Sequence, residues 1–235
     1  MPTIQKSIVD LTHDLRPSIP SWDGSCGFTL NRDVDYNDCK PPYLFRTQKI
    51  DMRAGMGTHM DAPAHCFEGQ STIEQLPLED LVVPCVVVRP EGAVNERTIF
   101  DLKALEKFEA VHGRIQPKSF VIVCTGWSKY WNEPAKYRND LQFPSVHEDV
   151  AALLVERGIS GLGTDTLSAD AGGKVFPVHN VILGSGKYLV ENIANAELLP
   201  PTGATALVMP IKILAGTEAP VRLAAVVGGI IHPHI

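Results

Sequence analysis

The sequence predicts a mixed α/β fold. Short runs of β-branched and apolar residues, bounded by Gly or Pro, are typical of strands, and segments with apolar residues at helical spacing lie between them. This alternation along the chain is the pattern of α/β proteins. At 235 residues the chain is long enough for a substantial core and within the range of one large domain. We therefore expect a single compact domain over residues 1–235.

The individual elements follow from local patterns. The predicted strands are apolar or β-branched runs at 82–89, 120–125, 161–164 and 206–214. Apolar residues at helical spacing predict a helix over 101–111. A second helix is expected over 145–157, because Ser145 precedes Glu148 by the spacing of a capping box and Gly158 follows the last residue.

The segment 17–42 lacks a regular pattern and contains several turn signals. It is too long for a simple connection. Two interpretations stay open: a lid or an arm that crosses to another subunit, and an ordinary surface loop.

Composition restricts the partners of the chain. The formal net charge is −6 and no cluster of Lys and Arg appears, which excludes an electrostatic footprint for nucleic acid. No apolar run approaches the length of a membrane span, and the first residues hold no apolar signal core. The five cysteines are scattered without a Cys-x-x-Cys pair. We expect a cytoplasmic protein without a disulfide framework.

The stretch Gly57–His65 carries the chemistry that points to a function. It places two imidazoles and a carboxylate within seven residues, and such groups bind divalent metals. In an extended segment His59 and Asp61 share a face, so both side chains can bind one ion. Pro63 indicates the end of the strand, after which His65 can turn back towards the ion. The alternative is a surface hydrogen bond between His59 and Asp61.

The downstream half supplies further candidate ligands. His179 lies in the apolar run VHNVIL, and Glu191 lies in YLVENI. A buried carboxylate is costly unless it is paired or bound to a cation. The alternatives are a hydrogen-bonded, half-buried His179 and a salt bridge from Glu191 to Lys187 or Lys212. Together with the first cluster, these residues favour a metal site.

These motifs resemble the cyclase family, which includes bacterial kynurenine formamidases and isatin hydrolases. The resemblance rests on His-x-Asp-x-Pro-x-His after Gly-Thr, a Gly-x-Asp-Thr segment, and a His twelve residues before the Glu of Leu-x-Glu-Asn. It covers nearly the whole chain.

The resemblance implies a swivelling β/α/β fold and a metal-activated hydrolase that acts on amides in small ring or aryl compounds. The metal ligands it implies are His59, Asp61, His179 and Glu191. It also implies that His65 either binds a second metal or acts in proton transfer. It also implies a homo-oligomer, a dimer or a tetramer, and we expect the active site near a subunit boundary.

The chain departs from the family motif at Gly55, where the family has a histidine that binds metal. Glycine has no side chain to donate, so we expect one well-held ion per chain. Cys66 is a possible substitute ligand, although a buried, inert thiol is the alternative. The departure also admits a protein that binds metal or a ligand on the same fold without turnover.

Imidazole and carboxylate ligands suit zinc or manganese, and the sequence does not choose between them. A bound divalent ion makes water acidic enough to attack an amide at neutral pH, and His65 is the candidate for moving its proton. We expect Trp22 and Trp127 to line the pocket for a small-molecule substrate, and for Trp127 the alternative is packing in the core or at an interface. Asp165 either orients a metal-binding histidine or caps a turn. Motifs for a serine nucleophile or for nucleotides are absent from the sequence.

Overall fold

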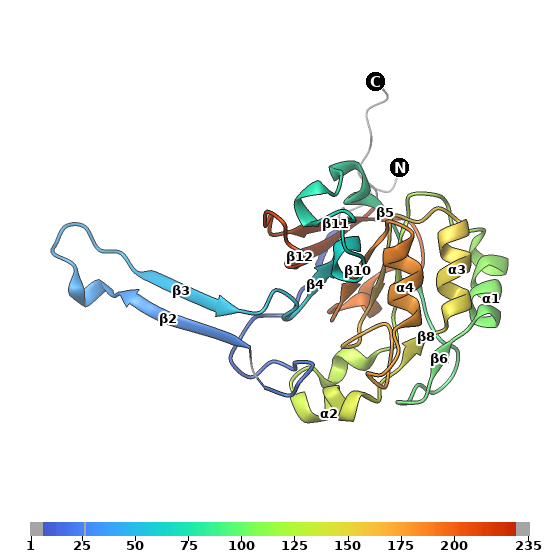
Figure 1. The fold of residues 1–235 in the computed structure, drawn as a ribbon, viewed down its shortest axis with the longest axis horizontal. Coiled ribbons are helices and arrows are strands. Elements are labelled where there is room, and N and C mark those ends of the chain that lie inside the picture. Colours follow the sequence, from blue (N-terminus) through green and yellow to red (C-terminus); the bar gives the residue numbers. More distant parts are fainter. Residues whose placement is uncertain (1–6, 26, 229–235) are drawn as a thin grey trace, which may run out of the picture.

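The structure is a computed structural model and describes residues 7–25 and 27–228. Within these residues an eight-stranded sheet has the order β1-β12-β11-β5-β7-β9-β10-β4, and β12 also pairs with β4. The sheet therefore closes on itself into a barrel-like ring (Figure 1). Its strands are β1 (Ser7–Asp10), β4 (His59–Asp61), β5 (Val82–Val88), β7 (Phe120–Val123), β9 (Gly161–Thr164), β10 (Tyr188–Glu191), β11 (Ala204–Pro210) and β12 (Glu218–Val227).

Four neighbouring strands, β5, β7, β9 and β10, run parallel, and the remaining pairs are antiparallel. Every residue of β7, β9 and β10 is buried, as expected for parallel strands that are covered on both faces. One face lies inside the ring, where Met60, Ile122 and Val190 belong to the same apolar cluster.

The outer face of the parallel strands is covered by helices. Figure 1 shows α1 (Leu102–His112), α3 (Glu148–Glu156) and α4 (Pro177–Gly184) side by side on this face. Their apolar side chains, among them Leu105, Leu154 and Ile182, pack on Val121 and Leu162 of the sheet. The mixed α/β architecture is thus confirmed. The closed sheet does not confirm the swivelling arrangement that the resemblance implied.

The remaining elements are short. They include α2 (Pro134–Arg138) and a two-stranded parallel sheet of β6 (Ile99–Phe100) and β8 (Ser145–Val146). The 3₁₀ helices are η1 (Tyr36–Asp38), η2 (Pro63–His65), η3 (Ile73–Gln75), η4 (Leu78–Asp80), η5 (Trp127–Tyr130), η6 (Asn139–Leu141) and η7 (Ala196–Leu198).

The predicted helix over 145–157 begins too early. Ser145 lies in β8, and His147 is the N-cap of α3, with its ring Nδ1 accepting a hydrogen bond from the Asp149 amide. The capping box assigned to Ser145 is therefore wrong, because the pairing of β8 with β6 holds that residue extended. Gly158, with a φ of +75°, follows the helix as expected.

The predicted strand over 206–214 also differs from the structure. β11 spans Ala204–Pro210, and the chain beyond it turns back to enter β12. Ile213 and Leu214 are exposed. They were included in the predicted strand because they are apolar, although the last residue of β11 that pairs with a neighbouring strand is Pro210.

The segment predicted to be irregular is largely a β-hairpin. β2 (Phe28–Val34) pairs with β3 (Thr47–Met52), and residues 28–52 form an arm that projects from the body (Figure 1). The arm exposes large apolar side chains, namely Leu30, Tyr36, Tyr43, Leu44, Phe45 and Ile50. This shape is not that of an ordinary surface loop, and the crossing of the arm to another subunit stays a prediction.

None of the helices in the described part of the chain is long and apolar enough to cross a membrane. The described cysteines Cys39, Cys66, Cys85 and Cys124 are all free. Cys26 and the C-terminal His232 and His234 lie outside the described residues.

Candidate metal centre

The register of three strands gathers the predicted ligands. β4 lies between β10 and β12, with His59 opposite Glu191 and Asp61 opposite Glu218. Cross-strand partners share a face, and alternate residues of one strand do too. His59, Asp61 and Glu191 therefore point to the same side of the sheet, while Met60 between them is buried in the core.

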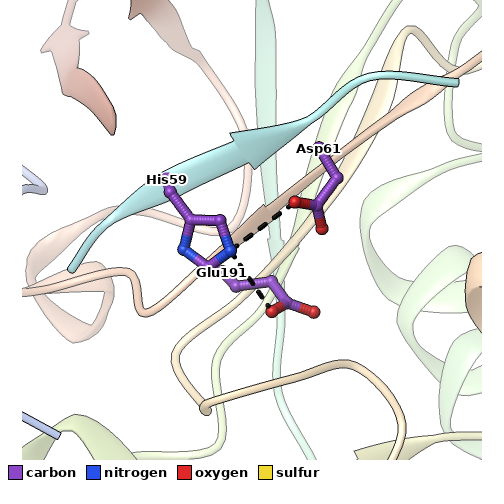
Figure 2. Close-up of side chains that lie close together, drawn as sticks. All are labelled: His59, Asp61 and Glu191. Atoms are coloured by element: carbon purple, nitrogen blue, oxygen red, sulfur yellow. Dashed lines mark ion pairs between the residues drawn. The ribbon is translucent and has the colours of Figure 1, made fainter. Parts of the chain in front are cut away.

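These side chains face one another at short range (Figure 2). The Nε2 atom of His59 lies 3.6 Å from Oδ1 of Asp61 and 3.7 Å from Oε2 of Glu191. His179, on α4, faces the other oxygen of each carboxylate, at 3.8 Å from Asp61 Oδ2 and 3.4 Å from Glu191 Oε1. All four predicted ligands are buried and lie together in one cluster.

The cluster fits a cation. Oδ1 of Asp61 is buried and has no hydrogen-bond partner among the described residues. An unpartnered carboxylate oxygen in the interior is costly, and a cation removes that cost. Ligand atoms about 2.1 Å from a tetrahedral ion lie about 3.4 Å from one another, which is close to the spacings found here. His59, Asp61 and Glu191 form a group whose donor atoms lie within 4.8 Å of one another, with no thiolate among them, and His179 approaches both carboxylates of this group.

Each imidazole is held by its second nitrogen. Nδ1 of His59 donates to the carbonyl of Gly57 at 2.9 Å, and Nδ1 of His179 lies 2.7 Å from Oδ2 of Asp170. Both rings therefore present Nε2 to the carboxylates. Asp170 also accepts the backbone amides of Val178 and His179, both at 3.1 Å, which fixes it against the first turn of α4.

Of the two roles that the sequence left open for Asp165, the structure shows the turn cap. The Asp165 carboxylate accepts the amides of Thr125, Gly126 and Trp127 and the Thr125 hydroxyl, so it caps the turn after β7. Asp170 holds the histidine instead. The only signal for Asp170 in the sequence is that it is an acidic residue a few positions before a helix, which is weak.

Burial and charge oppose each other in this cluster. Burial lowers the pKa of His179, but its hydrogen bonds to Asp170 and Glu191 outweigh burial and raise that pKa to about 11. Burial also lowers the pKa of His59, and the charges of Asp61 and Glu191 more than offset it, so the pKa is raised. Burial raises the pKa of Asp61. For Glu191, burial is outweighed by the hydrogen bond and charge of His179, so its pKa is lowered.

The sequence left open a salt bridge from Glu191 to Lys187 or Lys212. Among the ion pairs of the described residues, Glu191 forms neither. Its partners are the two histidines and the Ala169 amide, which donates to Oε1 at 3.2 Å.

The cluster lies at the wall of a cavity of about 350 Å³. The other residues that line this cavity include apolar side chains, among them Trp22, Met56, Leu167 and Phe176. Trp22 thus lines the cavity that adjoins the proposed ligands, and its contact with a substrate stays a prediction.

Trp127 does not line this cavity, so its expected place in the pocket wall is wrong and the alternative, core packing, holds. It is buried in a cluster with Trp131 and Tyr137, and its indole N–H donates to the carbonyl of Tyr137 at 2.8 Å. His13 stacks on Trp131 with ring centroids 4.0 Å apart.

His65 lies on η2 at the edge of the same cavity, with its ring 6.3 Å from that of His179. Its nearest carboxylate is Glu218 on β12, a residue that the sequence analysis did not identify. Cys66 follows His65 but is exposed rather than buried, and it belongs to neither of the two ligand groups in the described part of the chain.

Comparison with known proteins agrees with this geometry. The Cyclase family model matches residues 9–171. An isatin hydrolase of Roseibium aggregatum is 28% identical over 241 residues, which cover 94% of this chain and 91% of the relative. A kynurenine formamidase of Erythrobacter litoralis is 26% identical over 213 residues, 90% of each chain.

Solved structures show the same likeness. Isatin hydrolase A from Labrenzia aggregata, bound to benzyl benzoate, matches with a TM-score of 0.86 and 31% identity. The match covers 95% of this chain and 94% of that one. The family model spans more than half of the sequence, and the fold and the cluster agree with it. The chain therefore belongs to the cyclase family, and the relatives named here are hydrolases.

Proposed function

We propose that this protein is a metal-dependent hydrolase of a small amide or cyclic amide. The observation that carries the proposal is the convergence of two imidazoles and two carboxylates, with one unpartnered buried oxygen, at the wall of a cavity. A cavity with convergent polar groups and perturbed pKa values is the usual form of an active site.

The proposed substrates are isatin, an N-formyl aryl amine or an aryl lactone. At about 350 Å³ the cavity is small for a ligand site, and a single aromatic ring system matches it. Trp22 and Phe176, with ring centroids 5.8 Å apart, offer apolar faces on which a planar ring packs. The names of the relatives, isatin hydrolase and kynurenine formamidase, support the same class.

His59, Asp61, His179 and Glu191 would hold the ion, which is zinc or manganese. A divalent ion bound there supplies an acidic water and polarises the carbonyl under attack. The residues around the ion do the rest. Asp170 and the Gly57 carbonyl keep both imidazoles in one tautomer with Nε2 turned to the site.

His65 is the proposed proton carrier. Its side chain is 32% exposed and lines the cavity, so it contacts both solvent and a bound substrate. An imidazole in this position accepts the proton of the attacking water and returns it to the leaving nitrogen.

The test uses protein stripped with a chelator and reloaded with zinc or manganese. We expect hydrolysis of at least one member of a panel of isatin, N-formyl aryl amines and aryl lactones. Asp61→Ala should lose both metal and turnover, whereas His65→Gln should keep the tightly bound metal and lose turnover by about 10²- to 10⁴-fold. Metal-loaded protein that hydrolyses nothing in the panel would favour the second candidate, a binding protein without turnover, for which Gly55 is the motivation.

We further propose that the protein is a homo-oligomer, a dimer or a tetramer. The arm carries Tyr43 and Leu44 with exposed fractions of 79% and 57%. Apolar side chains gathered on one projecting hairpin are typical of an interaction site. A second copy of the chain is the proposed occupant, because the arm leaves the body between Trp22 of the cavity and the strand that carries the ligands.

A further inference from the structure

Asn192, the residue after the proposed ligand Glu191, is a buried polar residue in an unusual backbone conformation. It is 2% exposed, and its φ of +57° lies in the left-handed region that few residues other than glycine adopt. Its backbone amide donates to the Thr166 carbonyl at 2.9 Å, and its backbone carbonyl accepts the Thr58 hydroxyl at 2.6 Å. A non-glycine residue held in this conformation beside a ligand points to a functional contact of its side chain.

The Asn192 side chain contacts the turn that precedes His59. Its Nδ2 atom donates to the Gly57 carbonyl at 2.9 Å, and the same carbonyl accepts Nδ1 of His59 at 2.9 Å. A carbonyl oxygen only accepts hydrogen bonds, so the nitrogen end of the Asn192 amide has to face it. Both lone pairs of the oxygen are then in use, and the direction of this carbonyl fixes the ring of His59.

The turn at Gly57 needs this support. Gly57 has a φ of +67°, and a Cβ there would lie 2.5 Å from Cδ2 of Leu15, so the position requires glycine. Because glycine leaves the peptide conformationally free, the direction of its carbonyl depends on what holds it. The hydroxyl of Thr58 supplies a second hold through the Asn192 carbonyl. Side chain and backbone of Asn192 thus clamp both residues of the turn before β4.

Tyr137, on α2, aligns the Asn192 amide from its other end. The hydroxyl of this fully buried side chain lies 3.0 Å from Oδ1 of Asn192 and 3.0 Å from the backbone carbonyl of Asp165, so the two acceptors share its proton. Burial raises the pKa of the Tyr137 hydroxyl well above its ordinary value, so the hydroxyl keeps that proton. The amide of Asn192 therefore has a donor at one end and an acceptor at the other, which leaves it one orientation.

We propose that Asn192 is a positioning residue of the metal centre, which holds His59 through the Gly57 carbonyl and is itself aligned by Tyr137. The inference rests on the proposed function in one respect, that the cluster binds a divalent ion. Asn192 follows Glu191 at the end of β10 and holds the turn that begins β4, so it relates two ligands from different strands. A ligand that is oriented before the ion arrives loses less freedom on binding. Removing the Asn192 side chain should thus weaken metal binding although every ligand stays in place.

The experiment measures Zn²⁺ affinity of the chelator-stripped full-length protein by competition with a chromophoric chelator. Asn192→Gly removes the side chain and tolerates the left-handed backbone, and we expect it to lower the affinity by about 10- to 100-fold. Tyr137→Phe removes one hydroxyl and keeps the ring. Because it acts on His59 only through Asn192, we expect a smaller loss of about three- to tenfold.

Two further readouts separate positioning from a merely structural role. In the zinc-loaded protein the ring Nδ1–H of His59, followed by nitrogen-15 NMR, should exchange slowly with water and should exchange at least about tenfold faster in Asn192→Gly. With Co²⁺ in place of zinc, the visible absorption bands report ligand geometry, and they should change in the same variant. If Asn192 served only the stability of the turn, both signals would stay as in the unaltered protein.

Asn195→Gly is the matched control. Asn195 is also an asparagine with a left-handed backbone, at a φ of +55°, and its Nδ2 also donates to a backbone carbonyl, that of Asp10 at 2.8 Å. That carbonyl holds no proposed ligand. We expect the Zn²⁺ affinity of this variant to stay within about twofold of the unaltered protein, with the His59 Nδ1–H and the Co²⁺ bands unchanged.

The inference is overturned if Asn192→Gly binds Zn²⁺ as tightly as Asn195→Gly does, or if the His59 Nδ1–H exchanges equally slowly in both variants. Should Asn192→Gly fail to fold, Tyr137→Phe decides, and an unchanged Zn²⁺ affinity in that variant has the same meaning. Failure of the proposed function looks different: the affinities follow the expected order, but neither the unaltered protein nor any variant hydrolyses a substrate. An unaltered protein that binds no Zn²⁺ would overturn both.

Discussion

The Asp170 carboxylate holds His179 twice, through the ring Nδ1 at 2.7 Å and through the backbone amide at 3.1 Å. One acidic side chain thus fixes both the rotation of the imidazole and the first turn of the helix that carries it. A metal ligand gains affinity when it is oriented before the ion arrives, because less order has to be imposed on binding.

Replacing Asp170 should therefore weaken metal binding without removing a ligand. We expect Asp170→Asn to lower the affinity for Zn²⁺ by about 10- to 100-fold. Competition with a chromophoric chelator measures this. An affinity within twofold of the unaltered protein would show that Asp170 serves the helix alone.

Asp165 is the matched contrast, because it is also a buried aspartate but accepts hydrogen bonds from the turn after β7 and not from a proposed metal ligand. Asp165→Ala leaves the three amides after β7 without their acceptor. We expect the free energy of unfolding of the metal-free protein to fall by about 3 kcal/mol or more. Urea unfolding in the presence of chelator measures it, and metal affinity of the folded variant should stay close to that of the unaltered protein.

Metal binding should depend on pH well above the ordinary titration of histidine. With its pKa raised to about 11, His179 carries a proton in the metal-free protein at neutral pH, and an ion has to displace it. Affinity should thus rise by about tenfold per pH unit for each proton released, from about pH 6 to about pH 9. Calorimetry in buffers of different ionisation enthalpy counts the protons. Affinity that levels off above pH 7 would contradict the raised pKa.

The same shift has an opposite effect on the stability of the metal-free protein. A folded-state pKa raised from 6.5 means that the folded protein holds the proton of His179 more tightly than the unfolded chain does. The stability from this group is fully present below pH 6.5 and is lost as the pH rises towards 11. Thermal unfolding with chelator present should show stability declining across that range, and Asp170→Asn should reduce the slope.

The arm provides the prediction for assembly. Replacing Leu44 and Phe45 together with Glu should convert the proposed oligomer to a monomer, because the two charges would have to be buried at the interface. Light scattering at micromolar concentration tests this. A control with Glu at Val111, exposed on α1 away from the arm, should keep its mass. A monomeric unaltered protein would contradict the proposal directly.

The parts of the site that sequence predicted are those that depend on local geometry. His59 and Asp61 share a face because side chains alternate along a strand, and that follows from their spacing alone. Glu191 was identified because a carboxylate inside an apolar run needs a compensating partner.

The parts that sequence missed depend on pairing between distant segments. Glu218 joins the cluster only because β12 pairs with β4 in one register, and a shift of one residue would turn its side chain to the other face. Asp170 reaches His179 because the loop after β9 folds back on α4. Ser145 was assigned to a helix because nothing local revealed its strand partner, Ile99.

β4 has three residues, yet it is the strand that joins β10 to β12 and completes the ring. Two of those three residues are metal ligands in the proposed site. An ion held there would link the closing strand to both β10 and α4, and so add to the few backbone hydrogen bonds that a three-residue strand can make. An ion that binds only the closed sheet stabilises that form by mass action. Metal occupancy would therefore determine how often the sheet opens locally at β4, in addition to its role in the proposed reaction.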